Sequence, residues 1–394
     1  MTGPGQFADG TQDSENAFDS RVDLTGKTTT YSLYVSDSLA LTSQLELTVS
    51  GRYDHSHVSN DDAITPEDED GTLTGTHNFS RFNPAVGLTF NPRAGLTAYA
   101  GYSQGSRAPS AIELGCADPE NPCRLPNAMA GDPPLHQVVT GTIEAGLRGV
   151  ATSWLSWSAG VFRADNRHDI MFVADDTSGF GYFRNFGKTR RQGVELGAKA
   201  QVGAWTFGAN YTYLDATYRS DETLLGEGNS TNDGGAGFEG DIDVESGDRI
   251  PLVPKQMFKA FAAWQILPQL SVNADVLTST GMIARGNENN THQPDGVYYL
   301  GRGEAGGYAV LNFGVEYQPI DALSLFGQVN NVLDHHYYTA AQLGTTGFNS
   351  AGSFVARPFA GPIVDGERPG LGSTFYSPGA PRAFWFGARY SFGR

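Results

Sequence analysis

The chain has 394 residues, a formal net charge of −17 and 50 glycines, and these values already narrow the class of protein. Acidic residues outnumber basic ones by 43 to 26 and no run of lysine or arginine occurs, which excludes the usual basic nucleic-acid-binding surface. No window holds about 18 consecutive apolar residues, so helical membrane spans are excluded as well. With aromatic residues at 11%, the composition favours a large, folded, all-β protein.

Alternation of apolar and polar residues is the strongest pattern in the sequence. Along the segment that begins at Leu45, Leu47 and Val49 fall on one face, whereas Glu46 and Arg52 fall on the other. The same period of two recurs along the chain and predicts about thirteen strands. They are expected at residues 29–38, 44–57, 79–90, 96–104, 137–150, 154–173, 182–202, 205–218, 256–266, 270–280, 308–318, 323–334 and 382–392.

The connections between these segments alternate in length. Short turns are expected at 39–43, 91–95, 151–153, 203–204, 267–269 and 319–322, and long polar stretches at 58–78, 106–136, 219–255, 281–307 and 335–381. About ten tilted strand residues span about 25 Å, the height of the apolar band of an outer-membrane barrel. The pattern therefore predicts a transmembrane antiparallel β-barrel with short periplasmic turns and long extracellular loops. The alternative is a soluble β-sandwich, whose apolar face would point into a core.

The number of strands carries an expectation about the two ends of the chain. If the last strand ends in the periplasm, the first of thirteen strands starts outside the cell, whereas complete bacterial barrels have even strand numbers. The sequence therefore predicts residues 1–27 as the remnant of an extracellular loop and residues 28–394 as the C-terminal portion of a barrel. No signal peptide is visible. We expect that this chain alone does not form a stable closed barrel, because open edges in lipid are costly.

Four motifs then occur in the order typical of a known family. They are the segment 106–114 at the end of a strand, 191–196, 330–334 followed by Tyr337 and Tyr338, and 378–382 before the last strand. Together they resemble the barrel of TonB-dependent outer-membrane receptors. Gly387, Tyr390 and Phe392 also resemble the C-terminal signal that the barrel assembly machinery reads.

This resemblance implies a function and a set of partners. Full-length members have 22 strands, a plug domain inside the barrel and a TonB box, and this chain would match the last thirteen strands, with no counterpart of the plug or the box. The resemblance implies energised import of a scarce nutrient chelate, such as a ferric siderophore or cobalamin. The implied partners are outer-membrane lipid and lipopolysaccharide, the barrel assembly machinery, the chelate, and the TonB complex through the missing N-terminal plug. Because those coupling parts are missing, we expect no active transport by this chain alone.

Charged residues on the polar phase of the strands are expected to face the lumen. There they would hydrogen-bond a plug or one another rather than contact a ligand directly. They are Glu46, Arg52, Glu144, Arg148, Glu195, Lys199, Asp275, Glu316 and Arg389. An anionic chelate would instead meet cations of the outer lumen and loops through charge-assisted hydrogen bonds. The candidates for that role are Arg107, Arg163, Arg167, Arg184 and Arg190.

The two cysteines, Cys116 and Cys123, flank six residues in a long loop. In an oxidising surface compartment this spacing predicts a disulfide that closes a small loop, whereas a metal site lacks a neighbouring histidine. Acidic stretches at 61–70 and 239–248 are interpreted as solvated loops rather than calcium sites, although divalent ions could bridge them to lipopolysaccharide.

The histidine pairs, 55 with 57 and 335 with 336, predict no strong metal site. No catalytic triad or phosphate loop stands out, so we expect no enzyme activity and no cofactor. The remaining alternatives are a passive porin-like channel and a soluble secreted β-protein that binds a surface ligand.

Overall fold

The computed structural model describes residues 23–64, 72–114, 123–124, 135–174, 180–226, 228–238, 240–354 and 369–392. Its main feature is one antiparallel sheet of fourteen strands, in which thirteen follow one another and the short β5 (Cys123–Arg124) pairs at the side with β8. The thirteen are β1 (Leu24–Ala40), β2 (Leu45–Asp62), β3 (Gly75–Arg93), β4 (Leu96–Arg107), β6 (Val138–Thr152), β7 (Leu155–Ala174), β8 (Phe180–Val202), β9 (Trp205–Tyr218), β12 (Gln256–Leu267), β13 (Leu270–Ser279), β16 (Tyr308–Ile320), β17 (Leu323–Asn330) and β20 (Ala383–Tyr390). The prediction of about thirteen antiparallel strands is confirmed.

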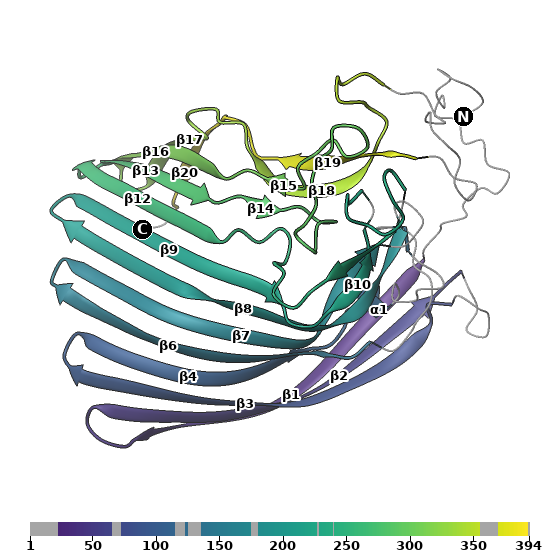
Figure 1. Cartoon of the computed structure of the whole chain (residues 1–394). Helices are drawn as coiled ribbons and strands as arrows, with labels where there is room; N and C mark the ends of the chain where they lie inside the picture. The colour runs from purple at the N-terminus through teal and green to yellow at the C-terminus, as the bar shows by residue number, and fades with distance from the viewer. Residues whose placement is uncertain are drawn as a thin grey trace.

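The sheet curves into an open trough (Figure 1). Consecutive strands are neighbours throughout, and within the described residues β1 and β20 form its two edges. At one end of the trough the strands are joined by short turns, for which Gly95 and Gly203 adopt positive φ angles of 78° and 60°. Glycine adopts this conformation without the steric cost that a side chain would bring. The other end carries the long connections.

The two faces of the sheet differ in chemistry. The convex face is apolar and exposed: Ile143 is 60% exposed, Leu196 45% and Phe386 81%. A soluble protein rarely leaves so many large apolar side chains in contact with water. These side chains therefore fit hydrocarbon as their solvent, as the alternation of the sequence predicted. Among the described residues, no helix is long or apolar enough to span a membrane.

Buried side chains gather at the long-loop end rather than along the sheet. One cluster surrounds Phe186 and Tyr218, whose rings lie 4.7 Å apart, and another joins Val58 to Leu114 of the one-turn helix α1 (Ala111–Leu114). Three small hairpins also lie at this end, where the sequence analysis expected only loops (Figure 1). They pair β10 (Glu222–Leu225) with β11 (Asp241–Val244), β14 (Met282–Ile283) with β15 (Glu304–Ala305), and β18 (Tyr338–Thr346) with β19 (Leu371–Pro378).

Candidate functional site

The concave face of the sheet is polar. Strand register shows which side chains share it, because residues directly opposite each other on paired strands point to the same side. Arg148 lies opposite Ser158, Lys199 opposite Ser156, and Arg389 opposite Ser324. By this register and by strand alternation, all nine residues expected to face the lumen fall on the concave side: Glu46, Arg52, Glu144, Arg148, Glu195, Lys199, Asp275, Glu316 and Arg389.

A hydrogen-bonded network on strands β1 to β3 lies on this face. Asp54 accepts hydrogen bonds from the Ser32 hydroxyl at 2.6 Å, the Arg52 Nε at 2.7 Å and the Asn83 amide at 3.1 Å. A second nitrogen of Arg52 donates to Ser32 at 2.8 Å. The carboxylate is thus saturated with donors, while about half of the Arg52 side chain stays exposed to the concave space.

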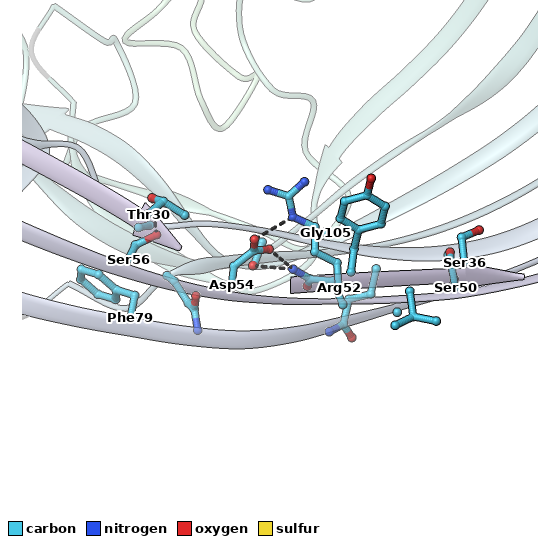
Figure 2. A pocket seen from close by; sticks show the side chains of 17 residues that line it. Thr30, Ser36, Ser50, Arg52, Asp54, Ser56, Phe79 and Gly105 are labelled. Atoms are coloured by element: carbon cyan, nitrogen blue, oxygen red, sulfur yellow. Dashed lines mark hydrogen bonds and ion pairs between the residues drawn. The ribbon is translucent and has the colours of Figure 1, made fainter. Parts of the chain in front are cut away.

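A cavity of about 690 Å³ opens beside this network. In Figure 2 the side chains of Thr30, Arg52, Asp54 and Ser56 rise from the same side of the strands and line it. Its volume is in the range of small-molecule sites, and its lining mixes a few convergent polar groups with apolar surface. It is therefore a candidate binding site on the described concave face.

The cavity lies where strands β3 and β4 separate. Their backbone pairing runs from Arg93 and Leu96 only as far as Ala85 and Ser103. The next residue of β3 is Pro84, which has no backbone N–H to donate to a ladder. Beyond this seam the β3 carbonyls of Phe82 and Ser80 accept hydrogen bonds from side-chain amides, those of Gln104 and Gln137, both at 3.1 Å.

Asn83 is the one buried polar side chain at the seam with an unused atom. It is 9% exposed and its amide nitrogen donates to Asp54 and to Ser106, whereas its Oδ1 has no hydrogen-bond partner in the described part of the chain. A buried acceptor without a partner costs free energy, which a bound donor would recover. The site is thus equipped to accept one hydrogen bond from an occupant.

The five arginines expected to contact a chelate do not form one cluster. Arg107 binds Glu113 of α1 through two nitrogens, at 2.6 and 2.9 Å, and Arg184 pairs with Glu222. Burial raises the pKa of Glu113, but the hydrogen bonds from Arg107 and Ser110 together with the Arg107 charge outweigh it and leave the pKa lowered. Both arginines are therefore already neutralised by a carboxylate.

The other three arginines lie on the wrong face for the expected role. Arg163 is directly opposite Ile143, an exposed residue of the convex face, and alternation places Arg167 and Arg190 on that side too. Asn166 and Thr189, which lie next to them, point to the concave side, where both bond to Asp169. Arg163, Arg167 and Arg190 therefore do not face the outer lumen, as the sequence analysis expected. The alternation that points apolar side chains to the convex face continues along these strands, so these three arginines point to that face as well.

The long connections between β9 and β20 interlock into a loop cap, formed by the described residues of 219–254, 281–307 and 335–378. Arg285 bridges to Gln342 and Tyr299 to Gly372. The Asn229 side chain donates to the carbonyl of Gly286 at 2.8 Å, which ties the first connection to the second. This cap was not expected from the sequence, in which its only signal is a scatter of asparagines.

His292 belongs to the loop cap and is 4% exposed. Its Nδ1 accepts a hydrogen bond from the backbone N–H of Ser230 at 3.0 Å, and its Nε2 lies 3.0 Å from the carbonyl of Gly301. Since a carbonyl only accepts, Nε2 carries the proton and the ring is neutral. Burial lowers the pKa of His292.

The remaining candidates carry little chemistry. His55 and His57 bond to Ser80 and Asn78, at 2.8 and 2.9 Å, and the described residues contain no group of three potential metal ligands. Cys116 lies outside the described residues, so the disulfide stays a prediction. Residues 65–70 and 239 of the acidic stretches also lie outside them.

The residues of the expected assembly signal lie on or beyond the last strand. Gly387 faces the Phe326 ring, while Tyr390 and Phe392 are exposed and meet edge to face at 4.7 Å.

Comparison with known proteins supplies the family. A family model described as "TonB dependent receptor-like, beta-barrel" matches residues 3–332. The probable TonB-dependent siderophore receptor PiuA of Acinetobacter baumannii is 26% identical over 288 residues, which are 71% of this chain and 34% of that relative. The chain thus spans about a third of the curated relative it matches.

Solved structures show the same fold. The siderophore receptor PiuA from Acinetobacter baumannii matches with a TM-score of 0.63 and 18% identity, over 93% of this chain and 44% of that chain. The ferric-catecholate import receptor Fiu of E. coli K12, in its closed form, matches with a TM-score of 0.60 and 20% identity, over 93% of this chain and 45% of that chain. The ferric yersiniabactin uptake receptor FyuA of Yersinia pestis matches with a TM-score of 0.61 and 17% identity, over 95% of this chain and 47% of that chain. Members of the matched family are receptors of the bacterial outer membrane and not enzymes. Sheet, faces and family model agree, and the chain belongs to the TonB-dependent receptor-like β-barrel family.

Proposed function

We propose that this chain is the barrel wall of an outer-membrane receptor that takes up a ferric chelate from outside the cell. The observation that carries the proposal is the division of one curved sheet into an apolar convex face and a polar concave face that holds a cavity of about 690 Å³. The relatives named for siderophore and ferric-catecholate uptake support this class of cargo.

In this proposal, residues of this chain contact the cargo, whereas partners supply the energy and insert the barrel. Arg52 pairs with Asp54 through Nε, but about half of its side chain stays exposed beside the cavity, and its remaining N–H groups would donate to an anionic chelate. The TonB complex would supply energy through a plug domain, and the barrel assembly machinery would insert the barrel into the membrane. We assign neither a plug nor energised transport to residues 28–394 by themselves. Of residues 1–27, which the sequence analysis expects in an extracellular loop, the structure describes 23–27, and Leu24 to Lys27 belong to strand β1.

Binding of iron(III) tris-catecholate to the chain in detergent micelles tests the proposal, with quenching of tryptophan fluorescence as the readout. We expect saturable quenching that weakens at high salt, because screening reduces attraction between charges. Substitution of Arg52 by glutamine should weaken binding by about threefold to tenfold, since a partly exposed charge contributes about 1 kcal/mol. Lys259→Gln removes a concave cation on β12, away from the cavity, and is the control.

Two other outcomes would replace the proposal. Ion conductance in planar bilayers without saturable quenching would favour a passive porin-like channel. Recovery of the chain in buffer without detergent would favour a soluble β-protein, because the convex face would then have to be covered by protein rather than by lipid.

A further inference from the structure

Two histidines that are distant in the sequence meet at the long-loop end of the sheet. His136 lies just before β6 and His168 lies within β7, and the centroids of their rings are 5.2 Å apart, with an angle of 54° between the ring planes. Both residues are exposed. Neither ring has a hydrogen-bond or ion-pair partner among the described residues. Four ring nitrogens are therefore accessible within a small volume.

His168 occupies a kink in β7. Its φ angle is 54°, in the left-handed region that residues other than glycine rarely adopt. The pairing of β7 with β8 includes Arg167 and Asp169 but skips His168. Arg167 points to the convex face, whereas the Asp169 carboxylate accepts a hydrogen bond from Asn166 on the concave side. The kink therefore reverses the alternation of the strand, and the residue in the strained conformation is the one whose ring meets His136. Backbone strain of this kind is concentrated at functional sites.

The side chain of Asn185 on β8 holds the backbones of both histidines. Its Nδ2 donates to the carbonyl of His136 at 2.9 Å and to the carbonyl of His168 at 3.0 Å. Its Oδ1 accepts a hydrogen bond from the N–H of His136 at 2.7 Å. One amide group thus fixes the two segments relative to each other. Ligands that are held in place before an ion arrives lose less entropy when it binds.

The separation of the two rings fits one metal ion between them. A bond from zinc to an imidazole nitrogen is about 2.0–2.1 Å, and the ring centre lies about 1.1 Å behind that nitrogen, so each centroid would be about 3.2 Å from the ion. Two such rings at the tetrahedral angle have centroids about 5.2 Å apart. The observed separation of 5.2 Å agrees with this value.

We propose that His136 and His168 bind one divalent transition-metal ion of the class that includes Zn²⁺ and Cu²⁺. Imidazole suits both ions, and Cu²⁺ binds most tightly along the first-row series. No group of three histidines, cysteines or carboxylates occurs among the described residues, so water would fill the other positions of the ion. The ion would link the segment before β6 to the kink of β7. This site is separate from the concave cavity and does not depend on the proposed cargo.

Electron paramagnetic resonance of the chain in detergent micelles, loaded with one equivalent of Cu²⁺, tests the site. We expect coupling of the copper to two imidazole nitrogens. In a titration, His136→Gln and His168→Asn should each lower the Cu²⁺ affinity by at least about tenfold, because loss of even an outer contact to a ligand typically costs that much. Asparagine is the replacement at position 168 because it tolerates the left-handed backbone. Either single variant should lose nearly as much affinity as the double variant, since one imidazole holds the ion weakly.

A second pair of histidines gives the matched control. His55→Gln with His57→Gln removes two histidines from one face of β2, where they bond to Ser80 and Asn78. This variant should keep the Cu²⁺ affinity and the two-nitrogen spectrum of the parent chain. Far-ultraviolet circular dichroism of all variants checks that the sheet has formed.

Hydrogen exchange with Zn²⁺ gives an independent readout. Zn²⁺ should slow exchange of the His136 and Asp169 amides in the parent chain but not in His136→Gln, because only the parent chain can be linked across the two segments. Equal losses of Cu²⁺ affinity in the control and in the site variants would overturn the proposal. Coupling to a single imidazole nitrogen in the parent chain would overturn it as well, and would leave His136 and His168 as an aromatic contact.

Discussion

Single side chains link the segments of the loop cap, and His292 joins two of them directly. It accepts from Ser230, contacts Tyr299 edge to face at 6.0 Å, and reaches Gly301, next to the strand that carries Thr374. Thr374 in turn accepts a hydrogen bond from the N–H of Gly303 at 2.9 Å. Because the neutral ring uses both nitrogens, protonation would remove the acceptor for Ser230 and leave a charge in a buried place.

The loop cap should therefore loosen in acid. The folded pKa of His292 is lowered, so as pH falls below the ordinary value of 6.5 the unfolded form takes up the proton first and stability is lost. Hydrogen exchange should show the Ser230 amide, corrected for intrinsic rates, less protected at pH 5.5 than at pH 7.5. In His292→Gln this additional pH dependence should disappear; the same loss of protection in that variant would assign the effect to another group.

At the level of elements, the sequence predicted the sheet because strand alternation is a local signal. The predicted strand at 205–218 matches β9, and most other boundaries differ by a few residues. Two strands are much longer than their neighbours: β7 has 20 residues and β8 has 23, as the long alternating segments indicated. The hairpins of the loop cap could not be predicted, since their two- to nine-residue strands are held by contacts between distant segments.

The candidate site shows where sequence reasoning about faces succeeds and where it fails. The nine charged residues assigned by alternation fall on the concave side, because each was placed relative to its own strand. Arg163, Arg167 and Arg190 were chosen by charge alone, and the register turned them outward. The gap beside Pro84 could have been suspected, because proline within a strand marks an edge or a bulge.

Packing between neighbouring strands depends on glycines that lie under large rings. A Cβ added at Gly208 of β9 would fall within the ring of Phe261 on β12, whereas nothing lies within 4 Å of one added at Gly87 of β3. Gly208→Val should therefore lower the free energy of unfolding by about 1–3 kcal/mol through overpacking. Gly87→Val should change it by much less. The midpoints of urea unfolding in detergent micelles give the comparison, and similar losses in both would refute a role for the Phe261 contact.

The whole sheet is open in the described residues, since β1 and β20 each pair on one side only. In hydrocarbon each unpaired backbone group costs several kcal/mol, so we expect that this chain alone does not settle into a closed barrel. After refolding in detergent, its mobility on a gel should not depend on prior heating. Amides of β1 and β20 should exchange faster than those of β7 and β8. A compact, heat-modifiable species with slow exchange at both edges would contradict this expectation.

The break in pairing at Pro84 has a mechanical consequence for such a wall. Elsewhere in the sheet, parting two neighbouring strands requires breaking backbone hydrogen bonds in sequence, which resists any change of curvature. Between β3 and β4, beyond Ala85 and Ser103, the links are side-chain hydrogen bonds instead, from Gln104 to the carbonyl of Phe82 and from Asn83 to the hydroxyl of Ser106. The wall can bend there by rotating side chains, so the trough has a line of easier bending alongside the cavity.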